Sequence, residues 1–234
     1  MKPIPIVLAA VALLIIAPLA YLPFAEPQQE SERATLPWQI EVDANGHSTV
    51  FGFTLGVSTL GDVHTRYGGD TEIAVITPKD GTSSLEAFNA EARAGFITGK
   101  MVFTAELAQE AVDAMRERAP RSSYMESTTR KATLHPDDFA LALQTPIRAI
   151  GFIPTADLDT ATVLQRFGEP AVRLRSAENL EHFLYPERGL EVIVDSRGKE
   201  LLQYVAPRDF ARLHAPLLAD GAAPDTAVEP ADSQ

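Results

Sequence analysis

The histidines and cysteines of the chain decide whether it can hold a metal ion. Five histidines stand at isolated positions, and the sequence contains no cysteine. The histidines are His47, His64, His135, His182 and His214. None of them belongs to an H-x-H, H-x-x-x-H or H-E-x-x-H pattern, the spacings that bring two imidazoles onto one zinc ion. We therefore expect no metal site and no cofactor.

Serines and paired carboxylates also lack the sequence context of a catalytic site. The serine pairs Ser83-Ser84 and Ser122-Ser123 lie outside a G-x-S-x-G turn, which exposes the nucleophile in many hydrolases. The carboxylates of Asp137-Asp138 stand where they can cap the start of a helix, a duty that explains them without acid–base catalysis. No glycine-rich phosphate loop of the G-x-x-x-x-G-K-[ST] type occurs. We expect the protein not to be an enzyme.

Strand alternation around His182-Phe183-Leu184-Tyr185 predicts a surface for recognition instead. Successive side chains of a strand point to opposite faces of the sheet, so the two aromatic rings would enter the core together. The face opposite to those rings is then available to a partner. The candidate binding residues on it are Arg173, Arg175, His182, Glu191 and Gln203.

These residues belong to the second of two similar segments. Val63–Gly68 has the sequence V-H-T-R-Y-G, and Val163–Gly168, one hundred positions later, has V-L-Q-R-F-G. Each segment follows a helix-capping residue, Thr59 or Asp159, and ends in a glycine that can adopt the left-handed conformation after a helix. Strand-like runs with close turns follow both, which predicts antiparallel neighbours. So long a period is typical of a duplicated domain, since solenoid units span about 20 to 50 residues.

The N-terminal segment Ile4–Leu22 is apolar and uncharged, close to the roughly 20 residues that a helix needs to cross a bilayer. Lys2 precedes it and glutamates follow it, so the N-terminus should stay in the cytoplasm and the body should face the periplasm. We expect a single-pass protein of the inner membrane. The alternative is a signal cleaved after Ala20 or Ala25, which would leave the body periplasmic or secreted.

The formal net charge of −12 argues against two classes of partner. Nucleic-acid phosphates and anionic lipid surfaces both repel an acidic protein. We therefore expect no nucleic-acid partner, and contact with the membrane only through the N-terminal helix.

The predicted fold class is α+β, with two tandem repeats, each an antiparallel sheet backed by short helices, after one N-terminal transmembrane helix. Helices are predicted over 105–119, 136–144 and 209–218, from apolar spacing and flanking prolines. The predicted organisation is an anchor or signal at 1–22, a linker at 23–37, a first repeat at 38–120, a connecting segment at 121–146, a second repeat at 147–218 and a disordered tail at 219–234.

Two short motifs of the second repeat carry a family resemblance. Arg166-Phe167-Gly168-Glu169-Pro170 and Tyr185-Pro186-Glu187-Arg188-Gly189-Leu190 resemble the SmpA/OmlA (BamE-like) family of small envelope lipoprotein domains. The resemblance covers about 50–104 and 150–205, and the tandem arrangement is similar to that of the β-lactamase inhibitor protein. It implies a helix-backed antiparallel sheet that binds other proteins, and it transfers no functional residue.

We therefore expect a membrane-anchored, exported, non-enzymatic binding or scaffold protein of the cell envelope, with another envelope protein as its partner. Two alternatives remain open: an envelope hydrolase with a cleft between the two repeats, and an inhibitor of a secreted enzyme. A deep polar pocket with two titratable groups within hydrogen-bond reach would favour the hydrolase, whereas a shallow sheet surface would favour the binding protein.

Overall fold

The computed structural model describes residues 35–79, 81–125, 128–219 and 222–224. The predicted anchor at 1–22, most of the linker and most of the tail lie outside these residues. Within the described ranges, no helix is long and apolar enough to cross a membrane. The same ranges form five α-helices and two antiparallel sheets, which confirms the predicted α+β class.

The helices are short. The α-helices are α2 (Leu60–Tyr67), α3 (Gln109–Arg118), α4 (Pro136–Gln144), α5 (Thr160–Phe167) and α6 (Ala211–Ala219), and the 3-10 turns are η1 (Gly68–Asp70), η2 (Pro186–Arg188) and η3 (Pro207–Asp209). The three helices predicted from apolar spacing correspond to α3, α4 and α6. Their ends differ from the predicted ends by a few residues at most, as is usual because helix termini fray.

Helices α2 and α5 start and end in the same way. Thr59 caps α2, since its side chain accepts from the backbone N–H of Asp62 while the Asp62 carboxylate accepts from the backbone N–H of Thr59. Asp159 caps α5 by accepting from the backbone N–H of Thr162 at 2.8 Å. Both helices end at a glycine with positive φ, 67° at Gly68 and 79° at Gly168.

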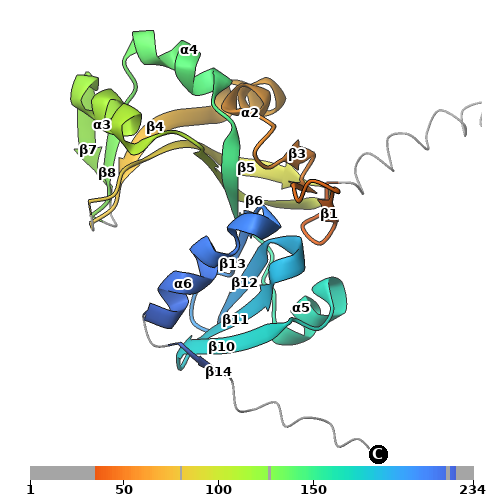
Figure 1. Cartoon of the computed structure of the whole chain (residues 1–234). Coiled ribbons are helices and arrows are strands. Elements are labelled where there is room, and N and C mark those ends of the chain that lie inside the picture. The colour runs from red at the N-terminus through yellow and green to blue at the C-terminus, as the bar shows by residue number, and fades with distance from the viewer. Residues whose placement is uncertain (1–34, 80, 126–127, 220–221, 225–234) are drawn as a thin grey trace, which may run out of the picture.

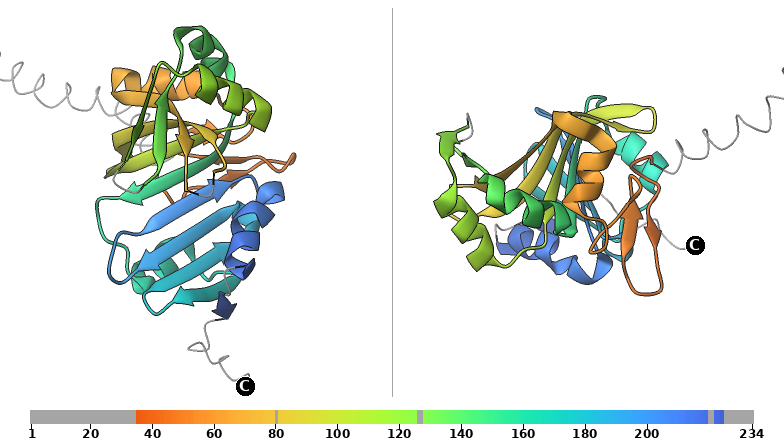
Figure 2. Two further views of the ribbon diagram at one scale, coloured as in Figure 1. Left: turned by 90° about the vertical axis from the view of Figure 1, so that its left-hand side faces the viewer. Right: turned by 90° about the horizontal axis from the view of Figure 1, so that it is seen from above.

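One large sheet contains the strands of both predicted repeats. Its order is β14 (Ala223–Pro224), β10 (Val172–Ala177), β11 (Leu180–Tyr185), β12 (Leu190–Asp195), β13 (Leu201–Val205), β9 (Ile147–Pro154), β6 (Ile97–Ala105), β5 (Ser84–Ala94), β4 (Thr71–Thr77), β8 (Arg130–Thr133) and β7 (Arg121–Tyr124). A small separate sheet is formed by β1 (Glu41–Val42), β2 (Ser48–Val50) and β3 (Phe53–Thr54). Figure 2 shows the strands of the large sheet side by side in one layer.

Strand β9 is the reason for this continuity, and it corrects the prediction of a separate sheet for each repeat. Its Phe152 lies opposite Met101 of β6 on one side and opposite Leu202 of β13 on the other. Pairing on both sides satisfies backbone N–H and C=O groups that an open edge would leave exposed. The same row of side chains is fully buried, so the join also extends the hydrophobic core across both halves.

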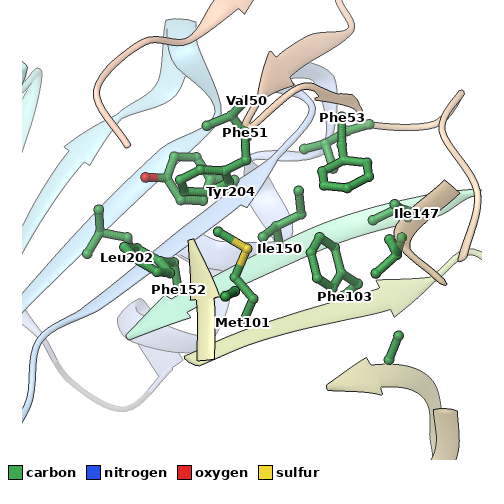
Figure 3. Packing of buried hydrophobic residues seen from close by; sticks show 14 of the residues in the cluster. Val50, Phe51, Phe53, Met101, Phe103, Ile147, Ile150, Phe152, Leu202 and Tyr204 are labelled. Atoms are coloured by element: carbon green, nitrogen blue, oxygen red, sulfur yellow. The ribbon is translucent and has the colours of Figure 1, made fainter. Parts of the chain in front are cut away.

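The main core lies on one face of the large sheet, here called the core face. Its centre is aromatic: Phe51 contacts Tyr204 and Phe152 with ring centroids 5.1 and 5.3 Å apart, and Figure 3 shows these rings together. Burial raises the pKa of Tyr204 well above its usual value, and its hydroxyl donates to the carbonyl of Pro37 at 2.9 Å. The segment at 35–58 is thereby fixed to the second half of the sheet.

The opposite face carries a second, smaller core in one half only. Phe210, Leu174, Leu184 and Val205 form a buried cluster, against which α6 packs. In Figure 1, α5 and α6 lie on opposite sides of strands β10 to β13. Helices α2 and α3 contact β4 and β5 from the core face. The opposite face of β4, β5 and β6 therefore differs from that of β10 to β13 in having no such helix among the described residues.

Candidate functional site

Two of the five predicted binding residues lie on the core face. Arg173 stands opposite Phe183 and Arg175 opposite Glu181 in the register of β10 and β11. The prediction that the arginines share a face with the other candidates is therefore wrong. The prediction failed because alternation along one strand does not fix its register with the next strand. A shift of one residue between paired strands moves every side chain to the other face.

The other three candidates do share the opposite face. Glu191 stands opposite Leu184 on one side and Gln203 on the other, and His182 is two residues from Leu184 in the same strand. His182 and Glu191 are buried, with 4% and 2% of their surface exposed, and Gln203 is half-buried. The structure thus brings these residues together, but His182 and Glu191 lie in the interior, where no partner protein reaches them directly.

On the core face, the two arginines hold one carboxylate between them. Arg173 donates to Glu181 at 2.7 Å, and Arg175 donates to the other oxygen of the same carboxylate. The Arg173 guanidinium also lies over the ring of Phe183, 4.9 Å from its centroid. Burial alone raises the pKa of Glu181, but the hydrogen bonds and charges of the two arginines outweigh it and hold the pKa below its usual range. This cluster therefore ties the first two strands after α5 together.

Replacing Glu181 with glutamine should destabilise the protein at neutral pH by about 2 kcal/mol, because two charge-assisted hydrogen bonds lose their ionic acceptor. The folded pKa of Glu181 is lowered from 4.5, so the wild-type advantage is present above that pH and disappears as the pH falls through the folded pKa. Urea denaturation of both proteins at pH 7 and near pH 3 measures this. A stability difference that stays constant with pH would contradict the assignment.

A serine completes a hydrogen-bonded chain with the two buried residues of the opposite face. The Ser176 hydroxyl lies 2.6 Å from Nε2 of His182, and Nδ1 of His182 lies 2.7 Å from Oε1 of Glu191. Ser176 itself is exposed. With the ring proton on Nδ1, the Nε2 lone pair faces the serine O–H, the arrangement of a general base oriented by a carboxylate. The three side chains have the order and contacts of a Ser-His-Glu triad.

His182 and Glu191 are among the binding residues predicted from the sequence, whereas Ser176 is not. The pairing of β10 and β11 shifts between Arg175 and Ala177, so Ser176 is the extra residue of a β-bulge. Bulges redirect a side chain, and here the bulged serine reaches a histidine on the neighbouring strand. The nearest sequence signal is the close turn between the two strands, which places their residues side by side. It shows neither the bulge nor the register.

A third feature is a hollow on the uncovered part of the opposite face, in the first half of the sheet. We call this surface the open face. Its hollow has a volume of about 280 Å³ and is lined by Glu72, Ala74, Ile76, Glu86, Phe88, Val102, Met125, Thr129 and Lys131. Phe88 and Met125 are 37% and 46% exposed. Lys131 and Glu72 form an ion pair at 2.9 Å beside it. Burial raises the pKa of Glu86.

The open face continues to an edge of the sheet. Among the described strands, β7 pairs with β8 alone, and all four of its residues are exposed. Its Ser123 stands opposite Lys131, a residue of the hollow, and so lies on the open face. An edge of this kind presents backbone donors and acceptors that an extended segment of another protein can pair with. The apolar hollow and the edge therefore form one continuous surface.

The described residues contain no group of three or more histidine, aspartate or glutamate side chains placed to hold a metal ion. The prediction that the protein uses no metal and no cofactor stays a prediction. Comparison of the chain with models of known protein families, with curated proteins and with solved structures gives no match. The BamE-like resemblance therefore rests on the two motifs of the sequence alone.

Proposed function

We propose that the chain is a membrane-anchored, exported binding or scaffold protein of the cell envelope that docks an envelope protein on its open face. The anchor is the apolar segment Ile4–Leu22, which keeps the N-terminus in the cytoplasm and the body in the periplasm. If the segment is cleaved instead, the body is exported all the same. The observation that carries the proposal is an apolar hollow that no described element covers, beside the edge strand β7 of the described sheet.

The arrangement of the strands supports the duplication that is part of this proposal. Helix α2 leads into the antiparallel strands β4, β5 and β6, and helix α5 leads into β10, β11 and β12. In the sheet, both sets run inward from opposite sides toward β9 and β13. Two BamE-like units joined through β6 of the first and β9 of the second would give this order.

The open face has the composition of a docking surface. Protein interfaces combine an apolar centre with a polar rim and favour aromatic residues and methionine. Phe88, Val102 and Met125 supply the apolar centre, while Lys131 and Glu72 supply the rim. An apolar side chain of the partner would fill the hollow, and its backbone would extend the sheet at β7. The lining of the hollow is mainly apolar, and its Lys131 and Glu72 are already paired with each other, which agrees with binding rather than catalysis.

Replacing Phe88 with glutamine should weaken partner binding at least about tenfold, because a central aromatic contact contributes roughly 2 kcal/mol or more. The matched control is Phe139→Gln on α4, since Phe139 has nearly the same exposure, 39% against 37% for Phe88. A photocrosslinking residue at Val102 of the full chain in envelope membranes identifies the partner. The same residue at Phe139 gives the background.

A single envelope protein crosslinked from Val102, lost in Phe88→Gln and retained in Phe139→Gln, is the expected result. Equal crosslinking in both variants, or none from Val102 above the background, would contradict the docking surface. The identity of the captured protein distinguishes a structural partner from a secreted enzyme that the chain inhibits.

Ester hydrolysis is a second candidate function, favoured by the Ser176–His182–Glu191 chain. The serine Oγ would attack an ester carbonyl while its proton passes to Nε2 of His182, and the alcohol would leave with that proton. Water, deprotonated by the same nitrogen, would then release the acid and restore Ser176. This site lies within the second half of the sheet, and not in the cleft between the two repeats that the hydrolase alternative predicts.

A fluorophosphonate probe tests this second function, since it labels only an activated serine. Labelling of the full chain that is abolished by Ser176→Ala and kept by Ser123→Ala would establish the nucleophile, because both serines are exposed. Absence of labelling, or labelling that Ser176→Ala leaves intact, would assign the hydrogen-bonded chain to the support of the fold.

A further inference from the structure

A second hollow lies on the core face in the second half of the sheet, and it shares no residue with the open face. Its volume is about 410 Å³, within the range of about 300 to 1,000 Å³ that is usual for small-ligand sites. Six carboxylates line it against one guanidinium, that of Arg175: Asp157, Asp159, Glu178, Glu181, Asp195 and Glu200. We call it the acidic hollow.

Five of the six carboxylates already have a partner within the protein. Lys199 contacts Asp157, Arg197 contacts Glu178, and the two arginines of β10 hold Glu181. Asn179 donates to Asp195 at 2.6 Å, and the backbone N–H of Thr162 donates to Asp159. The partial positive charge at the N-terminus of α5 is thus neutralised by its own capping residue, Asp159. These contacts explain five of the acidic residues without any ligand.

Glu200 is the exception. It is 5% exposed, and its Oε2 is buried with no hydrogen-bond partner among the described residues. The hydrogen bond to Asp157 is the main cause of the raised pKa of the nearby Lys199, and the charge of Glu200 adds to it without a hydrogen bond between the two. A buried carboxylate oxygen without a donor is costly. Since Glu200 lines the hollow, the donor it lacks can come from a group bound there.

The residues that line the acidic hollow favour an organic cation over a metal ion. No three of the carboxylates in the described chain are placed to ligate one metal ion. The wall also includes the apolar side chains of Leu158 and Val194, against which an alkyl stem can pack while its charged end stays polar. A planar guanidinium offers several N–H donors in a fixed fork that matches carboxylate oxygens.

We infer that the acidic hollow binds a guanidinium group on an alkyl chain, with Glu200 as its principal acceptor. Two sources have this chemistry: a free alkylguanidine and an arginine side chain of another protein. The acidic hollow is separate from the open face and its partner. The guanidinium site can therefore be disproved while the proposed docking function stands, and the reverse.

Titration of the full chain in neutral detergent with agmatine, followed by NMR, provides the direct test. We expect the amide resonances of Val194, Ser196 and Gly198, which lie in the wall, to shift with a millimolar dissociation constant. A second titration with the blocked peptide acetyl-Gly-Arg-Gly-amide distinguishes the sources. Tighter binding of the peptide indicates a protein arginine, and tighter binding of agmatine indicates a free alkylguanidine.

The decisive variant is Glu200→Gln, which keeps the side-chain size and removes the charge. It should bind agmatine at least about tenfold more weakly, whereas Glu106→Gln at an exposed position should bind like the wild type. Without ligand, Glu200→Gln should melt about 2–4 °C higher, because the unpaired buried charge is gone. At the same agmatine concentration its melting temperature should rise less than that of the wild type.

Three results would overturn the inference. The first is equal agmatine affinity in the wild type and Glu200→Gln. The second is the absence of resonance shifts in the wall of the hollow with both probes, a result that needs no variant and so holds even if Glu200→Gln does not fold. The third is a shift of the same amides by calcium chloride at lower concentration than by agmatine, which would assign the hollow to a metal ion.

Discussion

The Gly189→Ala variant is expected to lose about 3–5 kcal/mol of folding stability, enough to unfold a marginally stable domain. Gly189 ends η2 with φ 64° and ψ 34°, the left-handed conformation that side chains disfavour. A Cβ atom there would stand 1.9 Å from the carbonyl oxygen of Val205. That carbonyl belongs to the backbone of β13, so relief of the clash requires two paired segments to move apart.

Gly168→Ala provides the control, because it tests a positive φ without the clash. Gly168 has φ 79°, and nothing lies within 4 Å of the position of its Cβ. Its ψ of −171° lies outside the αL region, so we expect the substitution to cost about 1–3 kcal/mol, the usual penalty for a sparsely populated backbone conformation. Urea denaturation monitored by circular dichroism measures both variants. Equal losses would show that conformational strain, rather than the approach of Val205, governs Gly189.

The position of Gly189 matters because its motif connects the turn η2 to the end of α5. The Tyr185 hydroxyl donates to the carbonyl of Gly168 at 2.9 Å, and Arg188 donates to the carbonyl of Phe167 at 2.7 Å. Burial raises the pKa of Tyr185 to about 12. The two motifs that carry the family resemblance are therefore in mutual contact. Their residues stabilise the fold, as expected of residues to which no function was transferred.

Local signals made several elements predictable from the sequence. The caps of α2 and α5 depend on residues within three positions of Thr59 and Asp159, and the start of α4 follows from Pro136 at its first turn. Such contacts form between sequence neighbours, so residue type and spacing are sufficient to predict them. The continuous sheet was not predictable in this way, because β9 joins β6 and β13 through pairs some 50 residues apart in the chain.

The residues of the candidate sites were also predictable only where they depend on a single strand. Alternation correctly placed Phe183 and Tyr185 in the core, because it depends on one strand. The face of Arg173 and Arg175 depends on the register between two strands, which alternation leaves undetermined. Ser176 also required knowledge of a bulge. Glu200 carried no sequence signal, since only the packing around it makes its carboxylate buried and unpartnered.

Truncation of Glu191 is expected to be the most damaging change in the hydrogen-bonded chain. Glu191→Ala should cost about 3–5 kcal/mol, the usual effect of breaking a buried, hydrogen-bonded pair by removing one partner. His182 would keep its buried position, 4% exposed, while its Nδ1 lost the acceptor now 2.7 Å away. Glu191→Gln should cost less, since its amide oxygen can still accept from Nδ1–H.

Ser176→Ala separates support of the fold from chemistry at the same three residues. Because Ser176 is exposed, its loss should cost less than about 1 kcal/mol, the net contribution of an ordinary hydrogen bond. Urea denaturation of the three variants gives the order Glu191→Ala, Glu191→Gln, Ser176→Ala from most to least destabilised. A Ser176→Ala protein as unstable as Glu191→Ala would mean that the serine supports the fold, and its loss of probe labelling could no longer be attributed to a missing nucleophile. A stable Ser176→Ala protein makes the labelling experiment decisive, because the histidine and glutamate then remain in place around an absent hydroxyl.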